Sequence, residues 1–155
     1  MSTATPANFV IPTEPGRGPV LLGSRCRSCG TVVFPRMPVC PRCLRNGTME
    51  ETELGRTGRL YSHTIAHFAP QGFIAPFFQV FVDLPEGPRI FSLVGAEVPV
   101  GPGVLEDRME MRLVVEPVAA TPENKDRLTY KYVPVKSASS KSLPAESAAR
   151  ARRDR

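Results

Sequence analysis

The residues best suited to chemistry are four cysteines, which fall in two pairs of the same spacing. Cys26 and Cys29 form the first C-x2-C pair, Cys40 and Cys43 form the second, and ten residues separate the two. Two residues between thiols let both sulfurs of a pair turn onto one ion. Four thiolates at these spacings suit a tetrahedral zinc with no open position. Such a site stabilises a fold and activates no water, so the spacing predicts structural zinc.

The residues around the cysteines favour the turns that such a site needs. Gly30 follows the first pair, where the backbone often takes a positive φ. Pro41 fixes φ within the second pair. Residues 31–34 are β-prone and are followed by a proline, so a short hairpin can bring the pairs together. We expect a zinc ribbon over residues 25–47, ended by an Asn-Gly turn.

Other uses of the thiols fit the sequence less well. Two disulfides, or four unrelated thiols, are disfavoured by the paired spacing and by an N-terminus that lacks a secretory signal. Iron is a rival metal, because C-x2-C-G with C-P-x-C is also a rubredoxin pattern, but the short gap between the pairs favours zinc. Reduced thiols without an export signal point to the cytoplasm. No apolar run approaches the roughly 18 residues of a membrane span.

The elements that must position the cysteines are short strands, because the 155 residues include 17 prolines and 12 glycines. Residues 1–24 predict an irregular arm that leads into a first ribbon strand near Val20. Five strand-like segments follow, at 58–68, 76–83, 89–94, 109–116 and 128–133, with no convincing helix. An all-β chain is therefore expected, with an OB-fold-like five-stranded barrel over 54–135. A β-sandwich is the rival fold, but it usually needs about seven strands.

The net charge of +5 is unevenly distributed. Residues 46–135 have eight basic and twelve acidic groups, a net of −4, and residues 136–155 have six basic and two acidic groups, a net of +4. The final segment has little to bury, which predicts a disordered basic tail, although its Ala-rich end could fold as a helix on a partner. The ribbon contains five arginines with no acid among residues 25–45 to neutralise them: Arg25, Arg27, Arg36, Arg42 and Arg45.

Three further segments, taken with the ribbon, carry a resemblance to a known family. Residues 55–64 read G-R-T-G-R-L-Y-S-H-T, residues 89–95 read R-I-F-S-L-V-G, and residues 130–134 read Y-K-Y-V-P. In this order they resemble the rubredoxin-like zinc-ribbon plus OB-fold family, long described as a domain of unknown function. The resemblance covers roughly residues 20–135. Family members often have an amphipathic helical segment before the ribbon, whereas residues 1–24 are rich in proline and glycine.

The resemblance implies a subunit rather than an independent enzyme. It implies a small accessory protein beside a thiolase-superfamily enzyme that forms or cleaves carbon–carbon bonds in acyl-CoA thioesters. Such a subunit holds the complex together, and in some members it helps to bind the CoA ester. An aromatic β-ketoacyl-CoA such as benzoylsuccinyl-CoA is one candidate substrate, and a sterol side-chain aldolase is another candidate partner.

The residues themselves provide no catalytic group that stands alone. The four thiols are assigned to the metal, so no free cysteine nucleophile remains. His63 and His67 are the only histidines, and no further ligands near them would complete a metal site. Ser62, His63 and Asp83 lack the context of a nucleophile elbow. We therefore expect no catalytic residue and no activity of the chain alone.

Single-stranded nucleic-acid binding is the alternative function, because OB-folds and ribbons both serve it. The acidic barrel segment disfavours this function, since an OB-fold that binds nucleic acid needs a basic groove with exposed aromatic side chains. Six aromatic residues could form a stacking platform, but alternating strand positions favour the core for them: Tyr61, Phe68, Phe73, Phe77, Phe78 and Phe81. The ribbon arginines, Arg36 and Arg42 first, are expected to contact CoA phosphates or an acidic patch on the partner.

Overall fold

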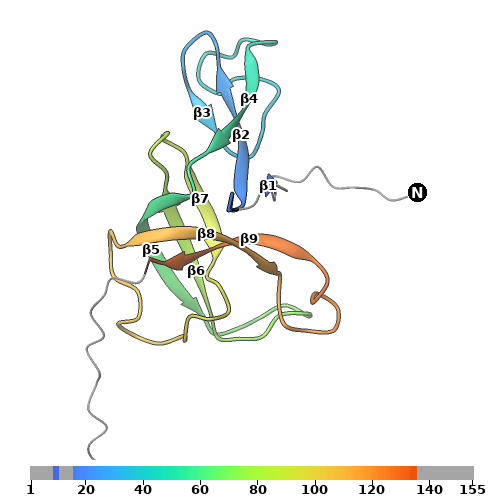
Figure 1. Ribbon diagram of the computed structural model, residues 1–155, viewed down its shortest axis with the longest axis vertical. Helices are drawn as coiled ribbons and strands as arrows, with labels where there is room; N and C mark the ends of the chain where they lie inside the picture. Colours follow the sequence, from blue (N-terminus) through green and yellow to red (C-terminus); the bar gives the residue numbers. More distant parts are fainter. Residues whose placement is uncertain (1–8, 11–15, 136–155) are drawn as a thin grey trace, which may run out of the picture.

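The computed structural model describes residues 9–10 and 16–135, and every regular element among them is a strand (Figure 1). The predicted all-β class is therefore confirmed. The predicted tail, 136–155, and most of the expected N-terminal arm lie outside the described residues. No helix in the described part of the chain is long and apolar enough to cross a membrane.

The first sheet is the ribbon sheet, and strand β2 (Val20–Cys26) is its centre. Strand β2 pairs antiparallel with β1 (Phe9–Val10), β3 (Val32–Val33) and β4 (Met49–Leu54). The sheet therefore includes residues on both sides of 25–47. The β2–β4 register places Arg25 opposite Glu50 and Ser24 opposite Glu51. An acidic strand thus runs beside the basic segment that contains the cysteines.

The second sheet is a nearly closed five-stranded barrel. Its strands are β5 (Thr57–Ala66), β6 (Phe77–Asp83), β7 (Arg89–Leu93), β8 (Glu110–Pro117) and β9 (Leu128–Pro134), in the order β7-β6-β5-β8-β9. The parallel bridge between Val94 and Tyr132 brings the two ends of this order together. The five predicted strands and the OB-like barrel are confirmed.

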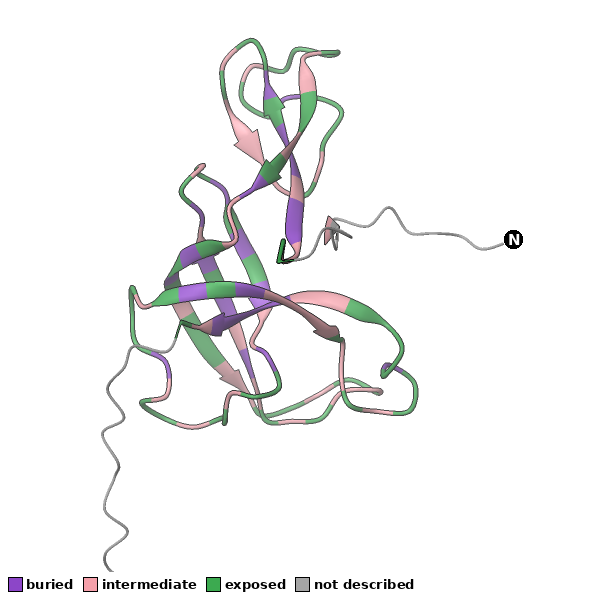
Figure 2. Ribbon diagram, viewed as in Figure 1, coloured by how far each residue is buried: buried purple, intermediate pink, exposed green. Residues whose placement is uncertain are grey.

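Alternation along the barrel strands sorts their side chains between core and solvent. In β6, Phe78, Val80 and Val82 are buried, whereas their neighbours are more exposed (Figure 2). Gly58 lies where β5 approaches β6 closely. A Cβ added at this position would lie 2.6 Å from the Asp83 carbonyl oxygen. A side chain there would push the two strands apart.

The ribbon and the barrel share one hydrophobic core. Leu21 of β2 and Leu54 of β4 belong to the same buried cluster as the barrel residues Leu60 and Tyr132. The ring of Phe34 also meets the edge of the Tyr130 ring at a centroid distance of 5.4 Å. The barrel end of the ribbon is therefore held by ordinary apolar packing.

Candidate metal centre

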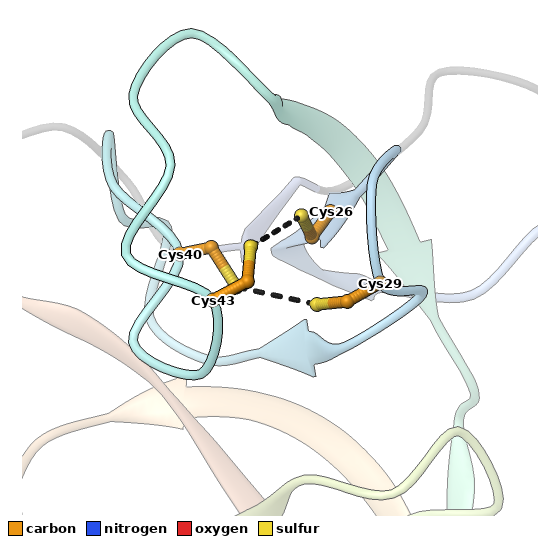
Figure 3. A group of neighbouring side chains, drawn as sticks. All are labelled: Cys26, Cys29, Cys40 and Cys43. Atoms are coloured by element: carbon orange, nitrogen blue, oxygen red, sulfur yellow. Dashed lines mark hydrogen bonds between the residues drawn. The ribbon is translucent and has the colours of Figure 1, made fainter.

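The four cysteine side chains converge at the far end of the ribbon (Figure 3). Their sulfurs all lie within 4.8 Å of one another, with Cys26 Sγ 3.7 Å from Cys43 Sγ and Cys29 Sγ 3.6 Å from Cys40 Sγ. A tetrahedral site with metal–sulfur bonds of about 2.3 Å has sulfur–sulfur edges of about 3.8 Å. The four sulfurs therefore form a group that fits one tetrahedral metal ion.

Each pair of cysteines lies on a tight turn, and the two turns share the same backbone hydrogen bond and a residue with positive φ. The Gly30 N–H donates to the Cys26 carbonyl oxygen and the Leu44 N–H donates to the Cys40 carbonyl oxygen, both at 2.9 Å. Gly30 has φ of 74° and Leu44 has φ of 56°. The expected positive φ at Gly30 is confirmed. In the second turn a leucine occupies the same conformation, which costs a residue with a Cβ about 1–2 kcal/mol.

Hydrogen bonds from the ribbon backbone and hydroxyls bias two of the thiols toward the thiolate that binds metal. The Thr48 hydroxyl lies 3.3 Å from Cys26 Sγ and, with backbone N–H groups, lowers the pKa of Cys26 to about 6. Thr31 lowers the pKa of Cys29 in the same way, with its hydroxyl 3.2 Å from the sulfur. The first turn, together with the Thr31 and Thr48 hydroxyls, thus supplies donors to negative sulfur.

The pKa of Cys43 shows the electrostatic cost of placing four sulfurs next to one another. The backbone of Arg45 favours its thiolate, but burial and hydrogen bonds with the other three cysteines together raise the pKa of Cys43 to about 11. Four adjacent negative sulfurs repel one another unless a cation lies between them. The site is therefore arranged for a cation that removes this repulsion.

The five ribbon arginines do not form a uniform unpaired patch. Arg27 Nε lies 3.2 Å from Glu50 Oε1, Arg36 forms an ion pair with Glu51, and Arg45 donates to the Ser28 hydroxyl at 2.8 Å. No acid lies among residues 25–45, but acids from outside that range pair with two of the arginines. The acids come from β4, which follows the cysteine segment in the sequence but pairs beside it in the sheet.

The remaining two ribbon arginines are exposed. The side chains of Arg25 and Arg42 form no hydrogen bond or ion pair with another residue in the described ranges. Near Arg42 in the sequence, three large apolar side chains are also exposed: Met37, Val39 and Leu44, the last at 75%. The end of the ribbon therefore combines cationic and apolar groups at its surface.

The aromatic residues divide between core and surface. Phe78 is in the core at 2% exposure, but Tyr61, Phe81 and Phe68 are exposed, the last at 92%, so the core assignment is wrong for these three. Phe73 and Phe77 are half-buried against each other, with ring centroids 6.3 Å apart.

Sequence reasoning missed the exposed ring of Phe91, which packs on Phe81 at a centroid distance of 5.5 Å. The Arg89 guanidinium lies 3.2 Å from the centroid of the Tyr61 ring. The alternation of Phe91 with the buried Ile90 and Ser92 was the signal that could have placed it outside.

The polar residues considered for catalysis are not assembled into a catalytic site. His63 and His67 are exposed, and neither belongs to the group of metal-binding side chains found in the described residues. The Asp83 carboxylate accepts two hydrogen bonds from Arg89, at 2.6 and 3.1 Å, rather than orienting a histidine. Asp83 also raises the pKa of Arg89 by this contact.

A four-thiol ribbon followed by an OB-like barrel on a shared core defines a zinc-ribbon/OB-fold protein. The chain belongs to the ChsH2, or DUF35, family. Residues 13–50 match the domain described as "ChsH2, rubredoxin-like zinc ribbon domain", and residues 51–115 match the "ChsH2, C-terminal OB-fold domain". The predicted family is confirmed.

Two curated relatives and one solved structure illustrate the family. A "DUF35 domain-containing scaffold protein" of Methanocaldococcus jannaschii is 42% identical over 72 residues, which are 45% of this chain and 51% of the relative. This chain thus spans about half the length of that protein. The "Benzoylsuccinyl-CoA thiolase subunit BbsA" of Thauera aromatica is 35% identical over 118 residues, 76% of this chain and 78% of the relative. The structure described as "Ltp2-ChsH2(DUF35) aldolase" superposes with a TM-score of 0.55 at 29% identity, covering 74% of this chain and 84% of that one.

Proposed function

We propose that this chain is a non-catalytic, zinc-containing accessory subunit of a thiolase-like enzyme that forms or cleaves carbon–carbon bonds in acyl-CoA thioesters. One observation carries the proposal. The ribbon and barrel together are similar, over 76% of the chain, to a protein named as a thiolase subunit. The likeness to a structure described as an aldolase supports the same class of partner.

The chemistry of the chain agrees with a non-catalytic role. All four thiols lie in one cluster, so they are poorly placed to act as an acyl-accepting nucleophile. The two histidines are exposed and are not paired with a carboxylate in the described part of the chain. In this proposal the partner supplies the catalytic cysteine and histidine, and this chain contributes assembly and binding surface.

Zinc is the proposed metal, with Cys26, Cys29, Cys40 and Cys43 as its ligands. The sulfur–sulfur distances of 3.6 and 3.7 Å suit a closed tetrahedral site, which has no room for water. Bound zinc would offset two of the four thiolate charges and hold the ribbon end together. Elemental analysis of the purified protein is expected to give one zinc per chain, and a red protein with a thiolate–iron absorption band would contradict this.

The end of the ribbon is the proposed contact with the partner. Leu44 is held at a positive φ and is also exposed, so its conformation and its environment are both unfavourable in the isolated chain. Burial of Leu44 and Met37 against the partner would recover part of this cost. Arg42 and Arg25 would then meet carboxylates, each charged hydrogen bond contributing about 1.5–3 kcal/mol when desolvated.

CoA-ester binding is the finer part of the proposal. Exposed arginines suit the phosphates of CoA as well as they suit carboxylates, because a guanidinium donates to both in a fork. Benzoylsuccinyl-CoA is the specific acyl-CoA substrate proposed for the complex, since the relative in Thauera aromatica has it in its name. The cytoplasm is the proposed location.

The test is reconstitution with a thiolase-like protein encoded beside this chain's gene. The two proteins are expected to co-purify, and the pair is expected to turn over benzoylsuccinyl-CoA or another acyl-CoA while this chain alone does not. Turnover by this chain alone would overturn the proposal, and so would the absence of a complex. The control is a thiolase-like protein of the same source encoded elsewhere, which is expected not to bind.

Nucleic-acid binding is the alternative that one observation favours. The exposed Phe81 and Phe91 rings and the Arg89–Tyr61 pair lie on the barrel strands, where an OB-fold could stack bases. The charge of −4 over residues 46–135 opposes it. Salt-sensitive, micromolar binding of a single-stranded oligonucleotide, with no complex in the reconstitution, would replace the proposed function by this one.

A further inference from the structure

A pocket of about 310 Å³ lies in the barrel, and none of the four cysteines lines it. Its walls come from the β5–β6 loop, the end of β7 with the loop that follows, and the β8–β9 loop. Most lining side chains are apolar, and they include Phe73, Ile74, Phe77, Val98 and Val118. One charged residue, Lys131 of β9, also lines it.

Hydrogen bonds join the β5–β6 and β8–β9 loops, both of which line this pocket. The Thr121 hydroxyl and the Asn124 side-chain amide both donate to the Gly72 carbonyl oxygen at 2.7 Å. Asn124 is itself buried. Both loops lie on the same side of the barrel, below β9 (Figure 1). The pocket is therefore a built feature of the barrel, in the size class of small-molecule sites, at the lower end of about 300–1,000 Å³.

Lys131 has unused hydrogen-bonding capacity at the pocket wall. Its side chain is 6% exposed, and its Nζ lies 3.6 Å from Glu116 Oε2, too far for a hydrogen bond. No other described residue accepts a hydrogen bond from it. Glu116 Oε2 already accepts a hydrogen bond of 2.9 Å from the Ala96 N–H. An ammonium has three donors, and burying them without acceptors costs free energy.

The ionisable side chains around Lys131 have a net positive charge that one anion could balance. A second pocket of about 450 Å³ adjoins the first and shares Ala96, Ala120 and Lys131 with it. Lys125 and Glu116 also line this second pocket. Two lysines against one glutamate leave a local charge of +1, so a monoanion placed at Lys131 would neutralise the site.

We propose that this pocket binds a small monocarboxylate with an apolar body, such as a medium-chain fatty acid or an aryl-alkanoic acid. The apolar body occupies the pocket lined by Phe73, Phe77 and Val98. The carboxylate accepts hydrogen bonds from Lys131 Nζ and faces Lys125. This inference does not rest on the proposed function, because it uses only the pocket and its charges.

Titration of the full-length, metal-loaded chain with octanoate tests the proposal. Saturable one-to-one binding is expected by calorimetry, with amide shifts in NMR spectra confined to residues 72–78, 93–100 and 118–131. The neutral 1-octanol is expected to bind about tenfold or more weakly, the loss of one charge-assisted hydrogen bond. Equal affinity for octanoate and 1-octanol would overturn the charge assignment, and the absence of saturable binding would overturn the site.

Two matched pairs of variants separate the roles of charge and volume. Lys131→Met keeps the length of the side chain and is expected to lower octanoate affinity about tenfold or more while leaving that of 1-octanol unchanged. Lys125→Met, which alters the more exposed lysine, is expected to have a smaller effect. Unchanged octanoate binding by Lys131→Met would refute the role of Lys131.

Val98→Trp fills the apolar part of the pocket and leaves Lys131 in place, so it remains informative if Lys131→Met fails to fold. It is expected to abolish binding of both octanoate and 1-octanol. Val135→Trp makes the same exchange at an exposed valine outside the pocket lining and is expected to bind octanoate normally. Normal binding by Val98→Trp would place the ligand elsewhere and overturn the proposal.

Discussion

The ribbon and the barrel differ in the kind of side chain that they bury. Eleven of the buried apolar side chains lie in the barrel: Leu60, Phe78, Val80, Val82, Leu84, Ile90, Leu105, Met111, Leu113, Tyr132 and Val133. In the ribbon, Val20, Leu21 and Leu54 lie at the barrel end, and beyond them the buried apolar residues are two cysteines, Cys26 and Cys40. The far end of the ribbon therefore has thiols where the barrel has a hydrocarbon core.

This difference assigns a different source of stability to each part. The barrel buries enough apolar surface to stabilise itself by the hydrophobic effect. The end of the ribbon has almost no such surface, so its free energy of folding comes from binding a metal ion. Loss of metal is thus expected to be a local event, and loss of a core side chain is expected to act on the barrel.

Breaking the metal site has the largest expected effect. Cys40→Ser is expected to abolish tight metal binding and to unfold residues 25–47, since metal affinity worth about 10–16 kcal/mol is coupled to folding in such sites. Elemental analysis and NMR measure the two effects. Barrel amides are expected to keep their native shifts, and Ser28→Ala, on the first metal-binding turn, is the control. Unfolding of the whole barrel by Cys40→Ser would contradict the separation.

Breaking the barrel core comes next. Phe78→Ala is expected to lower the free energy of unfolding by about 3–5 kcal/mol, because it leaves a cavity at a fully buried position. Denaturant unfolding measures the change, and metal content is expected to stay at one equivalent. Phe81→Ala removes an exposed ring from the same strand and is expected to cost less than about 1 kcal/mol. Similar losses in both variants would show that the core assignment is wrong.

The surface of the ribbon is expected to matter for assembly and not for folding. Arg42→Glu is expected to weaken the complex with the thiolase-like partner about tenfold or more, with metal content and melting temperature unchanged. Affinity measured by surface plasmon resonance at two salt concentrations checks this. Arg108→Glu, on an exposed barrel loop, is the charge-matched control. An equal effect of both variants would indicate a general charge effect and no specific contact.

The smallest expected effect is the relief of strain at the second metal-binding turn. Leu44→Gly is expected to raise the stability of the metal-loaded ribbon by about 0.5–1 kcal/mol, because glycine takes a positive φ without a Cβ clash. Hydrogen exchange of the ribbon amides measures it. Leu44→Ala keeps the strain and removes the apolar chain, so it is expected to give no gain. Both variants are expected to weaken the partner complex, which would identify Leu44 as a contact.

The strands and the cysteine group could be predicted from the sequence because each depends on local pattern. Alternation identified five barrel strands, and C-x2-C spacing identified residues that share one site. The pairing of Arg27 with Glu50 depends on the β2–β4 register, which the sequence does not state. Lys131 alternates like a surface residue of its strand, yet it is buried beside the loop residues Ala96 and Ala120, which line the same pockets. Such properties arise from tertiary packing and are absent from any one segment.

The connection between the two parts has a consequence for how this protein binds. Only Gly55 and Arg56 separate β4 from β5. The Gly55 N–H donates to Glu86 at 2.7 Å, and the Arg56 carbonyl oxygen accepts from Leu113 at 2.8 Å. A partner that contacts both the ribbon end and the barrel meets two surfaces already held in register. The second contact then forms at high effective concentration, without the entropy loss of ordering a flexible linker, so two weak patches can act as one strong one.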